Sequence, residues 1–413
     1  MKSVFFKSLC IFLSSIIIGL LLLILVYLLP TSIIRKNAKE SINKLLGEGL
    51  YPKIILEEHA TQLDNFTDAI MLQNATYNGK ENALMKTLNV YKYDSINYTS
   101  PIDSLNDSLN AKPTIQNSYS RYWHGYLIFL KPLLLLFNYE EIRIINILLE
   151  SILIFSVIYL FIKRKNYNLA FAYSLSILTI YPNVIYLSLQ FSTIFYIFNL
   201  GIIYLLLRND YLKTNNNYLF YFLILGILTS YFDFLTYPIT TVGIPLLVYL
   251  SLNYDEQFWK NIKTIILSGM MWGIGYFGMW ASKWIITSLI LNDNTLLDAI
   301  KQILYRTKGK GDVTYSPIKS VLLNLNNFKL MFILTTFILL IYILIKYLKK
   351  DIKFEKNNIL KYLPILLLCA LPLVWYFVTA NHSTIHAWFT YRSLIILAFG
   401  LYTYILYLFP KNS

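Results

Sequence analysis

The chain has 413 residues, of which 56% are hydrophobic and 14% charged, and its formal net charge is +14. Several uncharged apolar runs are long enough to cross the roughly 30 Å hydrocarbon core of a bilayer, which excludes an ordinary soluble protein. Such a positive charge would suggest a nucleic-acid partner in a soluble protein. Here most Lys and Arg residues fall in short loops between apolar runs, so the charge reports membrane topology. We expect a lipid bilayer as a partner and no nucleic acid.

The apolar runs predict an all-α polytopic membrane protein with about ten transmembrane helices. The first run, at 8–30, is longer than the roughly 7–15 residue core of a signal peptide and should be retained as a helix. A run at 126–138 is too short to span and is interrupted by Lys131-Pro132, so it should lie in the membrane interface or re-enter it. The remaining predicted spans are 143–162, 169–181, 184–207, 218–232, 239–252, 264–286, 329–347, 362–379 and 393–409.

The distribution of Lys and Arg predicts a cytoplasmic amino terminus in the cell membrane. The loops after residues 162, 207, 252 and 347, and the carboxyl-terminal tail, carry far more positive charge than the short loops opposite them. The long polar interval after the first span is then extracytoplasmic. This gives five segments: a first transmembrane helix at 1–30, a large extracytoplasmic loop with interfacial helices at 31–138, a transmembrane bundle at 139–286, a basic extracytoplasmic loop at 287–328, and carboxyl-terminal transmembrane helices at 329–413.

Asp64, Asp68 and Asp233 are candidates for chemistry on the predicted outer side, with Glu57-Glu58 as a rival carboxylate pair. Asp64 and Asp68 are four residues apart, so on a helix their carboxylates share one face, where one of them could act as a general base. The alternative, a solvated amphipathic surface helix, is equally compatible with the spacing. Asp233 ends a predicted span among aromatic residues; ionisable groups at membrane depth are costly and favour a function, although a turn-capping role before Pro238 fits too.

A motif at the membrane boundary combines Arg121, Tyr122, Trp123 and His124. Aromatic residues commonly anchor a protein at the bilayer interface, which accounts for Tyr122 and Trp123. Arg121 and His124 are harder to explain as anchors. A guanidinium could clamp a phosphate through two parallel hydrogen bonds, and an imidazole could donate to the same phosphate or carry a proton.

Further basic groups precede the last predicted span and populate the loop at 287–328. His382 and His386 have a spacing that zinc ligands use, but no further ligands are close in sequence, so we expect no metal site, with a divalent metal as the alternative. Together with Arg392 they could face an anionic headgroup, or they could belong to a capped helical turn. Arg306 lies in a basic loop that could attract a lipid-linked phosphate, or could be a solvated amphipathic helix.

This layout resembles the GT-C class of membrane glycosyltransferases, which use sugars linked to polyprenyl phosphate or pyrophosphate. The resemblance rests on the large first outer loop with Asp64 and Asp68, the boundary motif at 120–125, and later outer loops bearing Arg306 and Arg392. It covers the whole chain as architecture, but no single motif is diagnostic. In one respect the chain departs from the class, because the acidic motif there often follows the first helix closely, whereas Asp64 lies well beyond Pro30.

The resemblance implies transfer of a sugar from a polyprenyl-(pyro)phosphate donor to a cell-surface glycan, lipid or protein acceptor on the outer face. Asp64 would be the first choice for the base and Asp68 the second. A substrate-binding set would comprise Arg121, Tyr122, Trp123, His124, Asp233, Arg306, His382, His386 and Arg392, with no cofactor. The alternative is a transporter, flippase or polymerase of lipid-linked glycans. Transport folds tend to carry charges near the bilayer midplane, and the centres of most predicted spans lack them.

Overall fold

The computed structural model describes residues 2–292, 294–309 and 316–412, and within them the chain is almost entirely helical. Six segments of these described residues are long and apolar enough to cross a membrane. They are α1 (Lys2–Tyr27), α8 (Tyr139–Lys163), α11 (Leu189–Lys213, continued by the short η2, Thr214–Asn216), α14 (Phe258–Leu291), α16 (Pro317–Leu348), and Ala387–Leu408, which joins α21 (Ala387–Thr390), η3 (Tyr391–Leu394) and α22 (Ile395–Leu408).

Shorter apolar helices complete the bundle: α7 (Leu127–Leu136), α9 (Tyr167–Leu178), α12 (Tyr218–Phe232), α13 (Thr240–Leu252), and α18 (Leu363–Cys369) with α19 (Leu371–Val378). The helical class and the membrane character are therefore confirmed. The count of about ten spans stays a prediction, because only six described segments meet the length and hydropathy expected of a span.

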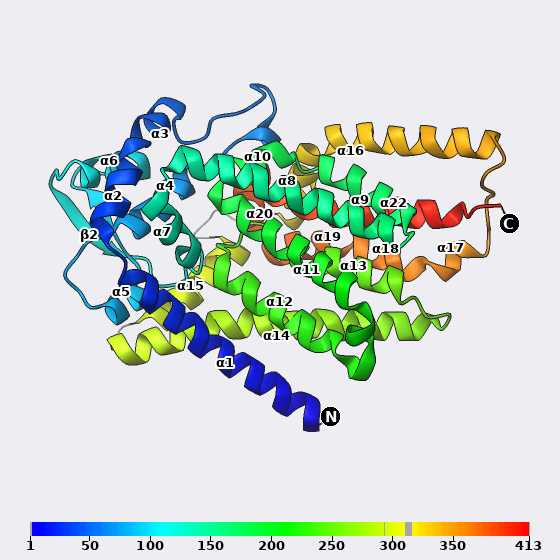
Figure 1. Ribbon diagram of the computed structural model, residues 1–413, viewed down its shortest axis with the longest axis horizontal. Helices are drawn as coiled ribbons and strands as arrows, with labels where there is room; N and C mark the ends of the chain where they lie inside the picture. The colour runs from blue at the N-terminus through cyan, green and yellow to red at the C-terminus, as the bar shows by residue number, and fades with distance from the viewer. Residues whose placement is uncertain (1, 293, 310–315, 413) are drawn as a thin grey trace.

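The polar interval forms a compact region at one end of the bundle, on the left of Figure 1. Its helices are α2 (Thr31–Glu40), α3 (Ile42–Glu48), η1 (His59–Thr61), α4 (Asn65–Thr76), α5 (Ala83–Asn89) and α6 (Pro101–Leu109). A two-stranded antiparallel sheet of β1 (Tyr91–Ser95) and β2 (Thr114–Ser118), in which Tyr91 pairs with Ser118, was not predicted and corrects the all-α description. Such short strands lack the sustained alternation of apolar and polar residues that indicates a half-buried strand.

The predicted basic loop at 287–328 is mostly helical. Helix α14 continues to Leu291, α15 (Thr295–Lys308) follows, and α16 already begins at Pro317. Both long helices extend past their apolar runs because hydrophobicity marks the part of a helix that meets lipid, while the backbone hydrogen bonds continue beyond it. Among the basic residues of this segment, Lys310 lies outside the described residues.

Basic residues collect at the end of the bundle opposite the polar region. The last turns of α8, α11 and α16 contain Lys163, Lys213 and Lys346. The amino terminus of α1 is at this end too, since Val4 and Lys7 line the same cavity as Tyr211 and the residues after it. We call this the basic end. The remaining short elements are α10 (Pro182–Tyr186), α17 (Asn358–Lys361) and α20 (Ala380–Ile385).

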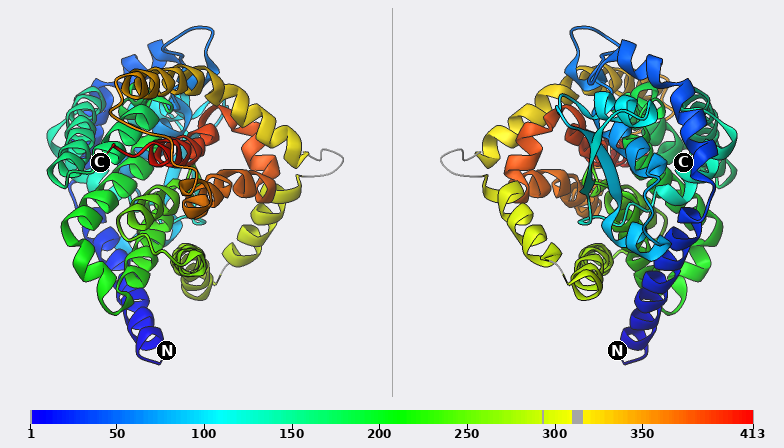
Figure 2. Two further views of the ribbon diagram at one scale, coloured as in Figure 1. Left: turned by 90° about the vertical axis from the view of Figure 1, so that its right-hand side faces the viewer. Right: turned by 90° about the vertical axis from the view of Figure 1, so that its left-hand side faces the viewer.

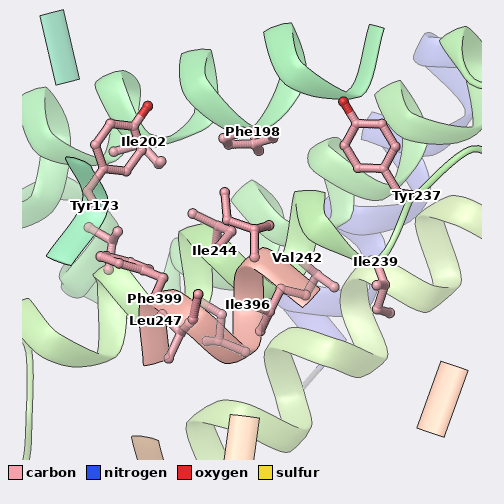
Figure 3. Packing of buried hydrophobic residues seen from close by; sticks show 14 of the residues in the cluster. Tyr173, Phe198, Ile202, Tyr237, Ile239, Val242, Ile244, Leu247, Ile396 and Phe399 are labelled. Carbon is pink, nitrogen blue, oxygen red and sulfur yellow. The ribbon is translucent and has the colours of Figure 1, made fainter. Parts of the chain in front are cut away.

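The centre of the bundle is a packed apolar core. Figure 3 shows Phe198 of α11, Ile244 and Leu247 of α13, and Ile396 and Phe399 of α22 converging. All five side chains are at most 1% exposed. The two views down the long axis in Figure 2 show the green helices and α22 grouped together, with α1 slanting away from them. The core therefore holds the middle helices in place, while α1 depends on other contacts.

Helices α12 and α14 approach one another closely at two glycines. A Cβ on Gly226 would lie 2.1 Å from the Trp272 carbonyl oxygen, and one on Gly275 would lie 2.3 Å from the Leu223 carbonyl oxygen. Small residues at such positions let two backbones pack tightly inside a membrane. The reciprocal pair fixes the spacing between α12, which leads into Asp233, and α14.

We expect Gly226→Ala to destabilise the protein by about 1–3 kcal/mol, because the added methyl group forces the two helices apart. Gly269→Ala is the matched control, since this glycine lies in the partner helix α14 but a Cβ there would meet nothing within 4 Å. Thermal unfolding of both variants in detergent measures the difference. Equal unfolding temperatures would contradict the close approach of α12 and α14.

Candidate functional site

Asp64 is a buried carboxylate at the first turn of α4. It precedes the helix as its N-cap, and its Oδ1 accepts the Thr67 backbone N–H at 3.0 Å. The side chain is only 2% exposed, and among the described residues only Thr67 donates hydrogen bonds to it. Burial raises the pKa of Asp64 to about 7, the nearby Asp68 raises it too, and Arg392 opposes the shift. A carboxylate with this pKa can take up a proton near neutral pH.

Asp68 has a different environment, although it is one helical turn away. Its carboxylate accepts the backbone N–H groups of Leu189 and Gln190 at 2.9 and 3.1 Å, the Tyr139 hydroxyl at 2.6 Å and the Ser188 hydroxyl at 3.3 Å. The first two are orphan donors at the start of α11, so Asp68 caps that helix from another element. With its oxygens occupied in this way, Asp68 joins α4 to α8 and α11.

Arg392 carries a buried guanidinium with few partners. The side chain is 0% exposed, and it donates only long hydrogen bonds, to the Ala60 carbonyl at 3.3 Å and to the Trp388 carbonyl at 3.4 Å. Within the described ranges its Nε has no hydrogen-bond partner, and no carboxylate lies within 4 Å of the guanidinium. A buried cation in this state is costly unless an anion joins it.

Aromatic rings connect Asp64 and Arg392. The guanidinium lies over the Phe191 ring at 4.3 Å from its centroid, and Phe191 contacts Trp388. Trp388 in turn packs edge to face against Tyr51. Burial, together with the nearby charge of Asp64, raises the pKa of the Tyr51 hydroxyl to about 12. We call Tyr51, Asp64, Phe191, Trp388 and Arg392 the Asp64 site. It draws on three segments that are far apart in the chain.

A second group of basic residues gathers around α20. His382 is buried and forms a 2.7 Å hydrogen bond between its Nε2 and the Leu235 carbonyl, and its ring lies 4.7 Å from that of His386. Burial lowers the pKa of His386 to about 4, helped by Arg306, and lowers that of His382 well below its usual range. Both imidazoles are therefore neutral at pH 7. Arg306 of α15 lies over the Tyr122 ring at 5.7 Å, which brings α15 to this group.

The boundary motif is largely occupied by contacts within the protein. Arg121 forms an ion pair with Asp298 of α15 at 2.8 Å. His124 is 1% exposed, its ring nitrogens contact the Tyr126 hydroxyl and the Tyr119 carbonyl, and burial lowers its pKa to about 3. The Trp123 indole donates to the Met279 carbonyl at 2.7 Å. These contacts tie the motif to α14 and α15.

Asp233 caps the short loop that follows α12. Its carboxylate accepts the Thr236 backbone N–H at 3.0 Å and the Thr236 hydroxyl, while burial raises its pKa to about 6. The same loop supplies the Leu235 carbonyl that binds His382. Asp233 therefore shapes the loop between the boundary motif and α20.

Several residues in and around the candidate site were not predicted from the sequence. Tyr51 and Trp388 carry no local signal in a chain with 35 tyrosines and seven tryptophans, and Asp298 looked like an ordinary surface residue. Glu150 did carry a signal, because it is an acidic residue inside an apolar run. It is 0% exposed within α8 beside the Ser192 hydroxyl, and none of the described Lys, Arg or His residues forms an ion pair with it.

No three His, Cys, Asp or Glu side chains in the described ranges are placed to hold a metal ion. His382 is hydrogen-bonded to the Leu235 carbonyl, and the His386 ring stacks on that of Phe389. Of the predicted site residues, Asp64 and Arg392 thus belong to the Asp64 site, and His382, His386 and Arg306 gather around α20. Asp68, Asp233 and the boundary motif are held by other contacts within the protein. Figure 1 shows α4, α15 and α20 near the same end of the bundle.

We expect Asp68→Asn to destabilise the protein by about 1–3 kcal/mol, because an amide nitrogen would replace one of the oxygens that accept buried N–H and O–H groups. Asp64→Asn should change stability little, since Asn caps a helix about as well as Asp. Thermal unfolding of the two purified variants separates these roles. A larger loss of stability for Asp64→Asn than for Asp68→Asn would contradict them.

Comparisons with known proteins identify no family for this chain. No protein-family model matches it, and neither a curated protein nor a solved structure matches it.

Proposed function

We propose that this protein is an integral membrane glycosyltransferase that transfers a sugar from a polyprenyl phosphate or pyrophosphate donor to a cell-surface glycan, lipid or protein acceptor. One observation carries the proposal. The buried guanidinium of Arg392, which has no carboxylate partner among the described residues, acts electrostatically on the buried carboxylate of Asp64, whose pKa is about 7. A phosphate needs the first group, and deprotonation of an acceptor hydroxyl needs the second.

The roles follow from the two environments. Arg392 would bind a donor phosphate oxygen with N–H groups that the protein leaves poorly paired, and Arg306 would add positive charge from α15. Asp64 would accept the proton of the acceptor hydroxyl as its oxygen bonds to the anomeric carbon. The bond between that carbon and the phosphate oxygen would break, and the electron pair would leave with the polyprenyl phosphate. The lipid phosphate is already a good leaving group, so positioning and charge stabilisation suffice.

Membrane orientation supports the same proposal. The basic end of the bundle should face the cytoplasm by the positive-inside bias, and helices α8 and α11 run from the polar region to that end. The Asp64 site would then face the outside of the cell, where lipid-linked sugars are used without a nucleotide. Tyr51 and Trp388 offer aromatic faces on which a sugar ring can stack.

A transporter of lipid-linked glycans is the second candidate, and Glu150 favours it. An ionisable residue buried inside a membrane-spanning helix often belongs to a transport pathway. The two candidates differ in products, because a transporter releases no polyprenyl phosphate. An assay that detects cleavage of the lipid-linked sugar therefore separates them.

We expect Asp64→Asn to lower the rate of sugar transfer by about 10²–10⁴-fold, the usual contribution of a general base. The assay measures polyprenyl phosphate released by the purified protein from synthetic polyprenyl-phosphate-linked hexoses and N-acetylhexosamines. Asp103→Asn is the control, because Asp103 lies in the first turn of α6 in the same polar region, where its carboxylate accepts the Thr99 and Ser100 hydroxyls and takes no part in the Asp64 site. Full activity of Asp64→Asn would remove the assigned base.

The pH profile provides an independent measurement. The base must be ionised to accept a proton, and burial holds the pKa of Asp64 at about 7. We therefore expect the rate to fall about tenfold for each pH unit below 7 and to level off above it. A profile that stays flat between pH 5 and pH 8 would show that a group with an ordinary carboxyl pKa, or no base at all, limits the rate.

A further inference from the structure

Helix α1 is attached to the bundle along only part of its length. In its carboxyl-terminal half, the Tyr231 hydroxyl donates to the Gly19 carbonyl at 2.7 Å, and Leu23 and Tyr27 are buried. In its amino-terminal half, Phe5 and Phe6 are 72% and 66% exposed. Figures 1 and 2 show this half slanting away from the other helices. Residues of this half and of the neighbouring helices line an open space between α1 and the bundle.

The space is a groove of about 1220 Å³ between α1, α7, α8, α11 and α12. This exceeds the roughly 300–1,000 Å³ of ordinary small-molecule pockets. Along α11 the lining extends from Leu189 to Leu212, which at the α-helical rise is roughly 34 Å, close to the depth of a bilayer core. The walls are predominantly apolar, so the groove suits hydrocarbon chains.

The groove has polar groups for a headgroup at the basic end. A smaller cavity of about 430 Å³ adjoins it there and shares the lining residues Lys7, Tyr211, Asn217 and Phe220, with Asn215 added. Of the described residues that line the groove, only Lys7 is charged. No carboxylate in the described part of the chain lies within 4 Å of its ammonium group. A lipid phosphate would therefore be attracted to this end.

We propose that the groove binds an anionic glycerophospholipid from the leaflet at the basic end. Its phosphate would lie against Lys7, with Tyr211 and Asn215 as polar neighbours, and its acyl chains would fill the space beside α1. The lipid would thereby supply contacts that the amino-terminal half of α1 lacks. This proposal is independent of the proposed enzymatic function.

The charge distribution favours a membrane phospholipid over the polyprenyl donor. At the opposite end the groove reaches Met71, Tyr126 and Leu189, none of which is charged. A donor phosphate has to reach Arg392, which does not line the groove. A polyprenyl phosphate bound with its phosphate at Lys7 would sit at the wrong end for transfer.

The test is native mass spectrometry of the full chain, released from nanodiscs that contain equal amounts of phosphatidylglycerol and phosphatidylcholine. We expect one retained phospholipid, with phosphatidylglycerol enriched at least fivefold. Lys7→Gln should abolish the enrichment, and Leu200→Trp, which fills the groove, should lower retention of both lipids at least fivefold. The controls are Lys349→Gln at the basic end and Leu207→Trp on α11; both residues are exposed and outside the groove, so retention should not change.

Equal retention of the two lipids by the unmodified protein would overturn the proposal, and so would equal losses in the groove and control variants. Displacement of phosphatidylglycerol by undecaprenyl phosphate would assign the groove to the carrier lipid and would also overturn it. Should Leu200→Trp not fold, Thr193→Phe fills the same wall. The sugar-transfer assay of Asp64→Asn is unaffected by any of these outcomes.

Discussion

The carboxylate of Asp68 is the interaction on which the site depends. It accepts two backbone N–H groups at the start of α11 and the hydroxyl of Tyr139 at the start of α8, so three segments meet at one buried charge. Arg143 reinforces the junction from α8, binding Glu48 of α3 and the Asn65 side chain. A charge buried in this way is tolerated only when donors surround it. The polar region is thereby fixed onto the membrane-embedded helices.

This junction leaves Asp64 free for another role. Because Asp64 precedes α4 as its N-cap, its carboxylate lies outside the regular helix and does not share the donors that surround Asp68. Its charge acts instead on the Tyr51 hydroxyl, and the charge of Arg392 acts on it. Two acids one turn apart thus have opposite characters, one fully hydrogen-bonded and the other poorly paired. Pairs of carboxyl groups in unlike environments are a common way for enzymes to divide structural and chemical work.

The sequence predicted the helical class, the membrane character and the positions of most apolar helices, because long apolar runs are the strongest signal in a chain. The predicted span at 218–232 coincides with α12, Tyr218–Phe232. The small sheet and the ion pair of Arg121 with Asp298 were not predicted, and a helix in the segment of α15 was only one of two alternatives. These features depend on contacts between distant segments, which periodicity cannot reveal. The different environments of Asp64 and Asp68 could not be predicted for the same reason. Their spacing is compatible with one shared helix face, and only the position of Asp64 as the N-cap of α4 distinguishes the two residues.

We propose that Arg392 and Asp64 form one site for a lipid-linked phosphate and an acceptor hydroxyl. The most direct measurement is an electron cryo-microscopy structure of the protein in nanodiscs with undecaprenyl phosphate. Our account predicts a phosphate in hydrogen-bonding contact with the Arg392 guanidinium, with Asp64 facing the same space. A phosphate bound only elsewhere, with Arg392 enclosed by protein groups alone, would contradict it.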